Sequence, residues 1–116
     1  MASRRLLLEA GIPSHFLSHD PNGIPGLKSG QQLSITHTKN FAGIALSKKP
    51  LGIDIQIFRP KICRIAPRFL HTAETFALEG RQSTEKLTLI WTAKEALYKA
   101  LKQKGIIFSK QLCVAK

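Results

Sequence analysis

The sequence predicts an α+β fold in which a small antiparallel sheet packs on helices. Two patterns along the 116 residues carry this prediction. In the first half, segments 33–37 and 51–58 alternate apolar and polar residues, which is typical of half-buried strands. In the second half, apolar residues recur at helical spacing within residues 85–104. Strands followed by helices along one chain favour the α+β class.

The N-terminal region is expected to be a short helix followed by irregular chain. Residues 3–10 can form the helix, which Gly11 and Pro13 would end. Residues 18–32 are dense in glycine, proline, asparagine and aspartate. Such residues favour turns, so we expect loops and turns over this segment.

Three strands are expected next, over 33–37, 41–46 and 51–58. The connections between them are short, which favours an antiparallel meander. Alternation places Leu33 and Ile35 on the inward face. The polar side chains expected on the outward faces are Ser34, Thr36, Asp54 and Gln56.

The second half predicts two helices. Thr72 is expected to cap a helix over 73–79, and Gly80 to end it. A longer helix is expected from Glu85 to Lys104, ended by Gly105. One or two short strands are expected at the end of the chain, over 106–108 and 111–114.

The charge of the chain points to anionic partners. Eighteen lysines and arginines against seven acidic residues give a formal net charge of +11. Nucleic acid, a phosphorylated cofactor, an acidic protein and an anionic membrane all fit this charge. No apolar run approaches the length that crosses a bilayer, and we expect a cytoplasmic protein. Cys63 and Cys113 lack ligand spacing, so reduced thiols are expected rather than a zinc site.

Three polar segments could bind phosphate and metal. Residues 36–39 (Thr-His-Thr-Lys) follow a strand and offer a hydroxyl, an imidazole and an ammonium to a phosphate. Asp54, within a run of isoleucines, suits a hard cation such as Mg²⁺. In the segment Lys94-Glu95, Glu95 lies four residues before Lys99, so both share a helix face. Taken alone, each segment also has an ordinary explanation. Residues 36–39 fit a polar turn, Asp54 fits a surface carboxylate, and Glu95 with Lys99 fits a helical salt bridge.

Together the three segments resemble the 4'-phosphopantetheinyl transferase superfamily, and its surfactin-type branch in particular. That branch carries a Ser-His-Ser-like segment, then Gly-(Ile/Val)-Asp-x-Glu, then Trp-x-x-Lys-Glu-(Ala/Ser)-x-x-Lys. The corresponding segments here are Ile35-Thr36-His37-Thr38, Gly52-Ile53-Asp54-Ile55-Gln56 and Trp91-Thr92-Ala93-Lys94-Glu95-Ala96-Leu97-Tyr98-Lys99. Arg68-Phe69-Leu70-His71-Thr72-Ala73-Glu74 resembles the stretch between the second and third. The resemblance covers residues 27–101 and implies a half or a pseudo-dimer of the transferase fold.

The resemblance implies Mg²⁺-dependent transfer of phosphopantetheine from coenzyme A to a serine of an acyl or peptidyl carrier protein. It implies a metal site of Asp54, Glu95 and Gln56. It also implies that Glu95, or a water on the metal, takes the serine proton, with Lys99 assisting. The residues implied to contact coenzyme A phosphates are Thr36, His37, Lys94 and Lys99. Candidates for its adenine end are Arg4, Arg5 and Lys28.

Two departures from the family pattern leave alternatives open. Gln56 stands where a second acidic ligand is usual, and it adds no negative charge. The second departure is length, because members of the surfactin-type branch consist of two similar halves and this chain is short beside them. We expect one transferase-like domain over 1–116, either incomplete at both ends or completed by forming a homo-oligomer. A non-catalytic module that binds coenzyme A or a carrier, and a basic nucleic-acid-binding domain, are the alternative functions. For the transferase we expect neither nucleic acid nor membrane as a partner, and carriers of fatty-acid, polyketide or nonribosomal-peptide synthesis all fit.

Overall fold

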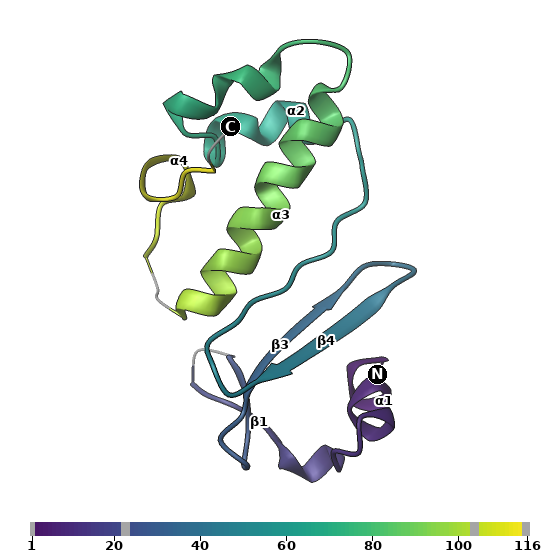
Figure 1. The fold of residues 1–116 in the computed structure, drawn as a ribbon. Helices are drawn as coiled ribbons and strands as arrows, with labels where there is room; N and C mark the ends of the chain where they lie inside the picture. Colours follow the sequence, from purple (N-terminus) through teal and green to yellow (C-terminus); the bar gives the residue numbers. More distant parts are fainter. Residues whose placement is uncertain (1, 22–23, 103–104, 115–116) are drawn as a thin grey trace. The chain divides into compact units, whose positions relative to one another are not determined.

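The computed structural model describes residues 2–21, 24–102 and 105–114, without the side chains of residues 2–4 and 14. Small antiparallel sheets occur together with several helices, so the predicted α+β class is confirmed (Figure 1). The chain forms two compact units. The sheet unit contains Met1–Ile55 and Ala96–Lys102, and the helical unit contains Gln56–Glu95 and Gln103–Lys116. No helix among the described residues is long and apolar enough to cross a membrane.

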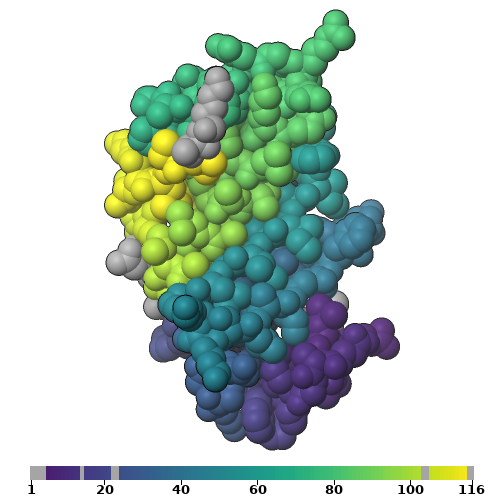
Figure 2. Space-filling model, in the orientation of Figure 1, coloured from purple at the N-terminus to yellow at the C-terminus, as the bar shows by residue number. Residues whose placement is uncertain are grey.

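The sheet unit has two antiparallel strand pairs, β1 with β2 and β3 with β4. Its elements are α1 (Ala2–Glu9), a 3₁₀ turn η1 (Ser14–Phe16), β1 (Leu17–His19), β2 (Pro25–Leu27), β3 (Gln32–His37) and β4 (Ala42–Ser47). Leu7, Leu27 and Leu33 form its buried core. Figure 2 shows α1, in purple, against the blue residues of this unit, in keeping with its contacts to β3 and β4.

The helix expected over 3–10 and the first two strands of the meander are present in this unit. The expectation of loops alone over 18–32 is wrong, because β1 and β2 pair across the turn there. In this hairpin the backbone of Asp20 donates to the carbonyl of Ile24, and the Asp20 carboxylate accepts from the Ile24 N–H. A single aspartate thus closes the turn and lets short strands form around it.

The third expected strand, over 51–58, is absent from the described structure. Two of its N–H groups donate to side chains of β3 rather than to a backbone ladder. Ser34 Oγ accepts from the Ile53 N–H at 3.0 Å, and Thr36 Oγ1 accepts from the Ile55 N–H at 3.0 Å. Ser34 and Thr36 are therefore buried, which corrects the expectation that they face outward. The expected three-stranded meander is reduced to the β3–β4 hairpin with a segment held alongside it.

The helical unit is built on the first thirteen residues of the long helix α3. Its elements are α2 (Ile62–Ile65), the 3₁₀ helices η2 (Ala66–Arg68) and η3 (Thr72–Leu78), α3 (Ser83–Leu101) and α4 (Phe108–Gln111). Residues 96–101 of α3 belong to the sheet unit. The buried core of the helical unit consists of Ile62, Ala66, Phe69, Ala77, Leu87 and Ile90. The Trp91 ring lies 5.2 Å from the Phe69 ring and 5.5 Å from the Phe108 ring.

Three sequence expectations for the second half need correction. The helix after residue 71 is a 3₁₀ helix, and His71 rather than Thr72 caps it, because His71 Nδ1 accepts from the Ala73 N–H. Helix α3 ends at Leu101, and Lys102 adopts a positive φ of 53°; the expected end at Lys104 lies outside the described residues. The strands expected over 106–108 and 111–114 are absent, because residues 108–111 form α4 instead.

Candidate metal and coenzyme site

The sheet unit holds Asp54 in a nearly buried, hydrogen-bonded position. Its side chain is only 6% exposed. Lys99 Nζ lies 3.3 Å from Asp54 Oδ1, and Thr36 Oγ1 lies 3.5 Å from the same oxygen. A buried carboxylate is costly unless a charge and hydrogen bonds compensate it, and Lys99 and Thr36 supply both. Thr36, at 4% exposure, therefore supports Asp54 and the segment that carries it.

Lys99, near the end of α3, forms hydrogen bonds both to β3 and to the segment that carries Asp54. Its ammonium donates to the carbonyl of Ile53 at 2.9 Å and to the carbonyl of Ile35 at 3.1 Å, besides contacting Asp54. These three contacts match the three donors of an ammonium group. The Lys99 side chain is 30% exposed, so it also keeps access to solvent. Lys99 thus places a positive charge at Asp54 and binds the backbone both of the segment that carries Asp54 and of β3.

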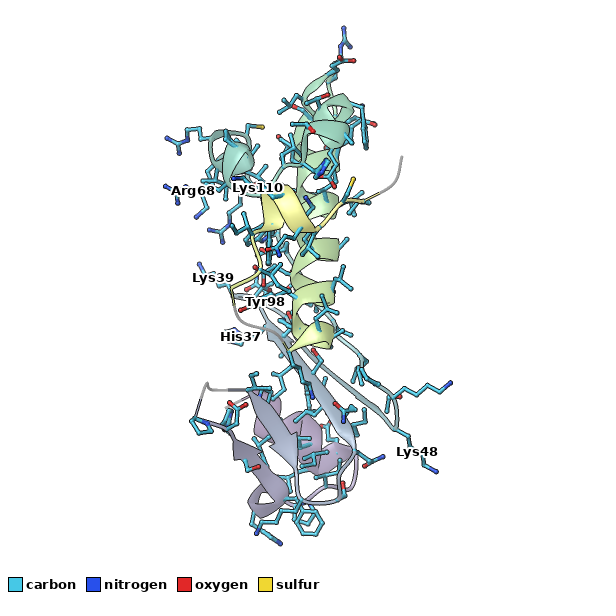
Figure 3. All side chains as sticks on the ribbon, turned by 90° about the vertical axis from the view of Figure 1, so that its left-hand side faces the viewer. His37, Lys39, Lys48, Arg68, Tyr98 and Lys110 are labelled. Carbon is cyan, nitrogen blue, oxygen red and sulfur yellow. The ribbon has the colours of Figure 1, made fainter. Side chains whose placement is uncertain are left out.

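The end of β3 presents exposed polar side chains. A tight turn follows the strand, in which the Thr38 N–H donates to the Phe41 carbonyl at 2.7 Å and Thr38 Oγ1 accepts from the Phe41 N–H at 3.2 Å. His37 and Lys39 flank Thr38, are exposed and project on the same side of the sheet unit, whereas Lys48 projects on the opposite side (Figure 3). His37 and Lys39 are placed to meet an anion from solvent.

The helical unit holds Lys94 and Glu74 in a buried ion pair. Lys94 is 1% exposed and Glu74 is 0% exposed, and Lys94 Nζ lies 2.5 Å from Glu74 Oε1. Burial by itself would raise the pKa of Glu74. The hydrogen bond from Lys94, the N–H groups of Val114 and His71, and the charge of Lys94 outweigh burial, and the pKa of Glu74 lies below its usual value.

The other two residues of the expected metal site belong to the helical unit. Glu95 follows Lys94 on α3 and is half-buried, and Gln56 is exposed. Among the described residues, no three His, Cys, Asp or Glu side chains form a group that could hold a metal ion. The chemistry of the expected donors nevertheless fits Mg²⁺, since Asp54, Glu95 and Gln56 all offer oxygen atoms. They supply two carboxylates and one uncharged amide.

Sequence reasoning missed the partner of Lys94. Glu74 lies three residues after His71, and its Oε1 accepts from the His71 N–H at 2.7 Å, which completes a capping box. Histidine is not one of the residues that usually begin a capping box, so that spacing was only a weak signal for an N-terminal cap. It gave no sign that the same carboxylate would also meet a lysine twenty residues later in the chain. Of the adenine-end candidates, Arg5 and Lys28 are exposed, and the side chain of Arg4 lies outside the described residues.

The comparison with known families concerns the same region of the chain. Residues 50–113 match the 4'-phosphopantetheinyl transferase superfamily. The chain belongs to this superfamily. The match includes Asp54, Gln56, Glu74, the Lys94-Glu95 pair and Lys99, and it begins after the His37 segment. The membership inferred from the three motifs is therefore confirmed, whereas the roles of individual residues stay predictions.

Curated relatives agree with this membership. A 4'-phosphopantetheinyl transferase of Bacillus subtilis is 30% identical over 93 residues, which cover 78% of this chain and 41% of the relative. The 4'-phosphopantetheinyl transferase gsp of Aneurinibacillus migulanus is 27% identical over 104 residues, which cover 84% of this chain and 44% of the relative. A Synechocystis protein provisionally named as the same transferase is 34% identical over 93 residues, 72% of this chain and 38% of the relative. The chain thus spans less than half the length of these relatives.

Proposed function

We propose that this chain transfers the 4'-phosphopantetheine group of coenzyme A to a serine of a carrier protein, with Mg²⁺. Membership of the transferase superfamily supports the reaction class. The observation that carries the proposal is Asp54: a nearly buried carboxylate, held by Lys99 and Thr36, at the acidic position of the superfamily's Gly-Ile-Asp motif. A carboxylate that is nearly buried beside specific partners is better explained by a use of its charge than by packing alone.

In the reaction, the serine hydroxyl oxygen forms a bond to the β-phosphorus of coenzyme A. The bond between that phosphorus and the bridging pyrophosphate oxygen breaks, and 3',5'-ADP leaves with the electron pair. Glu95 accepts the serine proton. The carrier thereby gains the phosphopantetheine arm, and atoms and charge balance. Transfer of this kind needs positioning, charge neutralisation and a base more than covalent help from the protein.

Asp54, Glu95 and Gln56 would hold the magnesium ion. When bound, Mg²⁺ supplies positive charge to the pyrophosphate and to the leaving group. Lys99 would add a second cationic contribution on the Asp54 side, since it keeps 30% exposure. We assign the ribose phosphate to His37 and Lys39, because Thr36 is buried and its oxygen already bonds the Ile55 N–H.

The charge of the chain supports anionic substrates. The formal net charge of +11 suits both a polyanionic coenzyme and an acidic carrier protein. The exposed cations among the described residues of the helical unit are Arg59, Lys61, Arg64, Arg68, Arg81 and Lys110. They would raise the rate at which acidic carriers meet the protein at low salt.

Gln56 favours a second candidate, a module that binds coenzyme A or a carrier without turnover. An amide in place of a carboxylate contributes an oxygen ligand but no negative charge. The affinity for the metal is therefore lower than with three carboxylates. The transferase and the binding module share the same residues. They differ in whether the carrier changes mass.

Mass spectrometry of the carrier tests the proposal. Purified protein is incubated with coenzyme A, Mg²⁺ and an apo-carrier, and the carrier is weighed. A gain of about 340 Da that disappears with chelator and with Glu95→Gln supports transfer by the proposed residues. Glu85→Gln, which changes an exposed acid in the first turn of the same helix, is the matched control and keeps the gain. No gain across several carriers, with coenzyme A still bound, supports the binding module instead.

A further inference from the structure

The role of Lys94 is where the structure departs most from the family expectation. We propose that Lys94 and Glu74 form a positioning pair that fixes Glu95 for metal binding, and that Lys94 does not contact the coenzyme phosphates. This inference rests on the proposed function for the role of Glu95. The pair itself rests only on contacts within the helical unit.

All three donors of the Lys94 ammonium are used inside the protein. Lys94 Nζ donates to Glu74 Oε1 at 2.5 Å, to the Phe69 carbonyl at 2.5 Å and to the Phe108 carbonyl at 3.2 Å. An ammonium has three donors and no acceptor, so no donor remains for a phosphate. With 1% exposure, the side chain also has almost no contact with solvent.

Glu74 is equally committed to internal partners. Oε1 accepts from Lys94 and from the His71 N–H, and Oε2 accepts from the Val114 N–H at 2.5 Å. Moving Lys94 toward a ligand would leave this carboxylate buried without the cation that compensates it. The destabilisation caused by an unpaired buried charge is far larger than the stabilisation gained from a phosphate contact at the surface.

The pair joins segments that otherwise have little in common in sequence. Phe69 follows η2, Glu74 lies in η3, Phe108 begins α4 and Val114 lies beyond it. Lys94 binds Phe69, Glu74 and Phe108 directly, and Glu74 in turn accepts from the Val114 N–H, so all four segments meet at one turn of α3. Glu95 is the next residue of that turn, so the direction of its side chain depends on how this turn is held.

Lys94 occupies a position that normally carries an apolar side chain. Leu87, Ile90 and Lys94 are spaced by three and four residues and are all buried, so they share the inward face of α3. An inward lysine is tolerated there only because its charge is paired. A phosphate ligand, in contrast, would be expected on the exposed face of the helix.

Charge removal distinguishes a positioning pair from a phosphate ligand. Lys94→Met leaves Glu74 buried and uncompensated, whereas the double variant Glu74→Gln/Lys94→Met removes both charges. Breaking one side of a buried ion pair is strongly destabilising, and replacing both sides with uncharged residues is much less so. Lys86→Met is the matched control, because Lys86 lies on the same helix and its ammonium donates to the exposed Glu79 carbonyl at 3.2 Å.

The first readout is the thermal midpoint of the full chain in metal-free buffer. We expect Lys94→Met to lower it by about 10 °C or more, and the double variant to regain at least about half of that loss. Lys86→Met is expected to stay within about 2 °C of the wild type. A double variant no more stable than Lys94→Met would contradict the claim that Lys94 and Glu74 compensate each other's charge.

The second readout is the transfer reaction below the lowest midpoint. We expect Lys94→Met to raise the Mg²⁺ concentration for half-maximal rate several-fold with the KM for coenzyme A unchanged, and the double variant to return it to within about twofold of wild type. A KM for coenzyme A raised about tenfold in both variants would make Lys94 a phosphate ligand and overturn the inference. If the wild-type chain transfers nothing, the proposed function and the positioning role both fail. The thermal midpoints then still show whether Lys94 and Glu74 form a compensating ion pair.

Discussion

Gly52 marks the closest approach between two backbones in the sheet unit. A Cβ atom built on Gly52 would overlap the carbonyl oxygen of Ala96 and lie 2.8 Å from both the Ala96 carbonyl carbon and the Ala100 nitrogen. These atoms belong to the backbone of α3, which cannot rotate away as a side chain can. Gly52→Ala must therefore push the segment that carries Asp54 away from the helix that carries Lys99.

The size of the effect follows from the overlap. Non-bonded carbon atoms in good contact lie about 3.5–4.0 Å apart, and the Ala96 oxygen is closer still, so the two backbones must separate by more than about 1 Å. Overpacking of this kind costs about 1–3 kcal/mol, and more where a backbone has to move. Separation also stretches the contacts of Lys99 to Ile53 and Asp54, now 2.9 and 3.3 Å. This loss is partly offset, because alanine restricts the unfolded chain and thereby stabilises the folded protein by about 0.4–1 kcal/mol. Because a backbone has to move, the cost of overpacking lies at or above the upper end of its range, and we expect a net loss of at least about 2 kcal/mol in the free energy of unfolding.

Urea unfolding followed by circular dichroism measures this loss, with Gly43→Ala as the matched control. The nearest atom to a Cβ on Gly43 is Thr36 Cγ2, at an ordinary 3.4 Å. Both substitutions change the unfolded chain in the same way, so their difference isolates the clash with α3. We expect Gly43→Ala to lie within about 1 kcal/mol of the wild type. A Gly52→Ala variant as stable as Gly43→Ala would refute the close approach of these two backbones.

Three further predictions concern single side chains. Thr36→Val should lower the free energy of unfolding by about 1–3 kcal/mol, because the Ile55 N–H loses its acceptor; Thr36→Ser, which keeps the hydroxyl, should lose less than half as much, and equal losses in urea titrations would count against this bond. Gln56→Glu should lower the Mg²⁺ concentration for half-maximal transfer several-fold, because it adds a negative charge to the proposed site; an unchanged Mg²⁺ titration would place residue 56 outside that site. The pKa of Glu74 is lowered in the folded protein, so its contribution to stability is complete above the unfolded value of about 4.3 and disappears as the pH falls through the folded value. Urea midpoints between pH 6 and pH 3 should therefore fall more steeply for the wild type than for Glu74→Gln, and parallel curves would contradict the lowered pKa.

Local periodicity predicted the elements whose hydrogen bonds are local. The helix near residues 3–10, the strands near 33–37 and 41–46, and most of α3 appear where the sequence placed them. The segment 51–58 shows where local patterns fail. Its alternation of isoleucine with polar residues is typical of a strand, yet the hydroxyls of Ser34 and Thr36 take the donors of Ile53 and Ile55. Competition of that kind depends on a partner nineteen residues away, and periodicity carries no information about it.

The motifs predict which residues form the candidate site, but they carry no information about the environments of those residues. Motif order identified Asp54, Glu95 and Lys99, and the superfamily match contains all three. The family resemblance also implies that Lys94 contacts a coenzyme phosphate. Whether a lysine beside a site faces the ligand or the core depends on helix rotation and on a partner elsewhere in the chain. For Lys94 that partner is Glu74, and the spacing within the motif could not reveal it.

The central claim is that Asp54 and Glu95 serve one Mg²⁺–coenzyme A site, and titration calorimetry tests it most directly. Coenzyme A is titrated into the full chain with and without Mg²⁺, using the wild type, Asp54→Asn, Glu95→Gln and the control Glu85→Gln. We expect Mg²⁺ to tighten binding at least about tenfold in the wild type and in Glu85→Gln, and to have little effect in Asp54→Asn and in Glu95→Gln. Binding that ignores Mg²⁺ in the wild type, or that keeps its full Mg²⁺ response in either of the two site variants, would contradict the account.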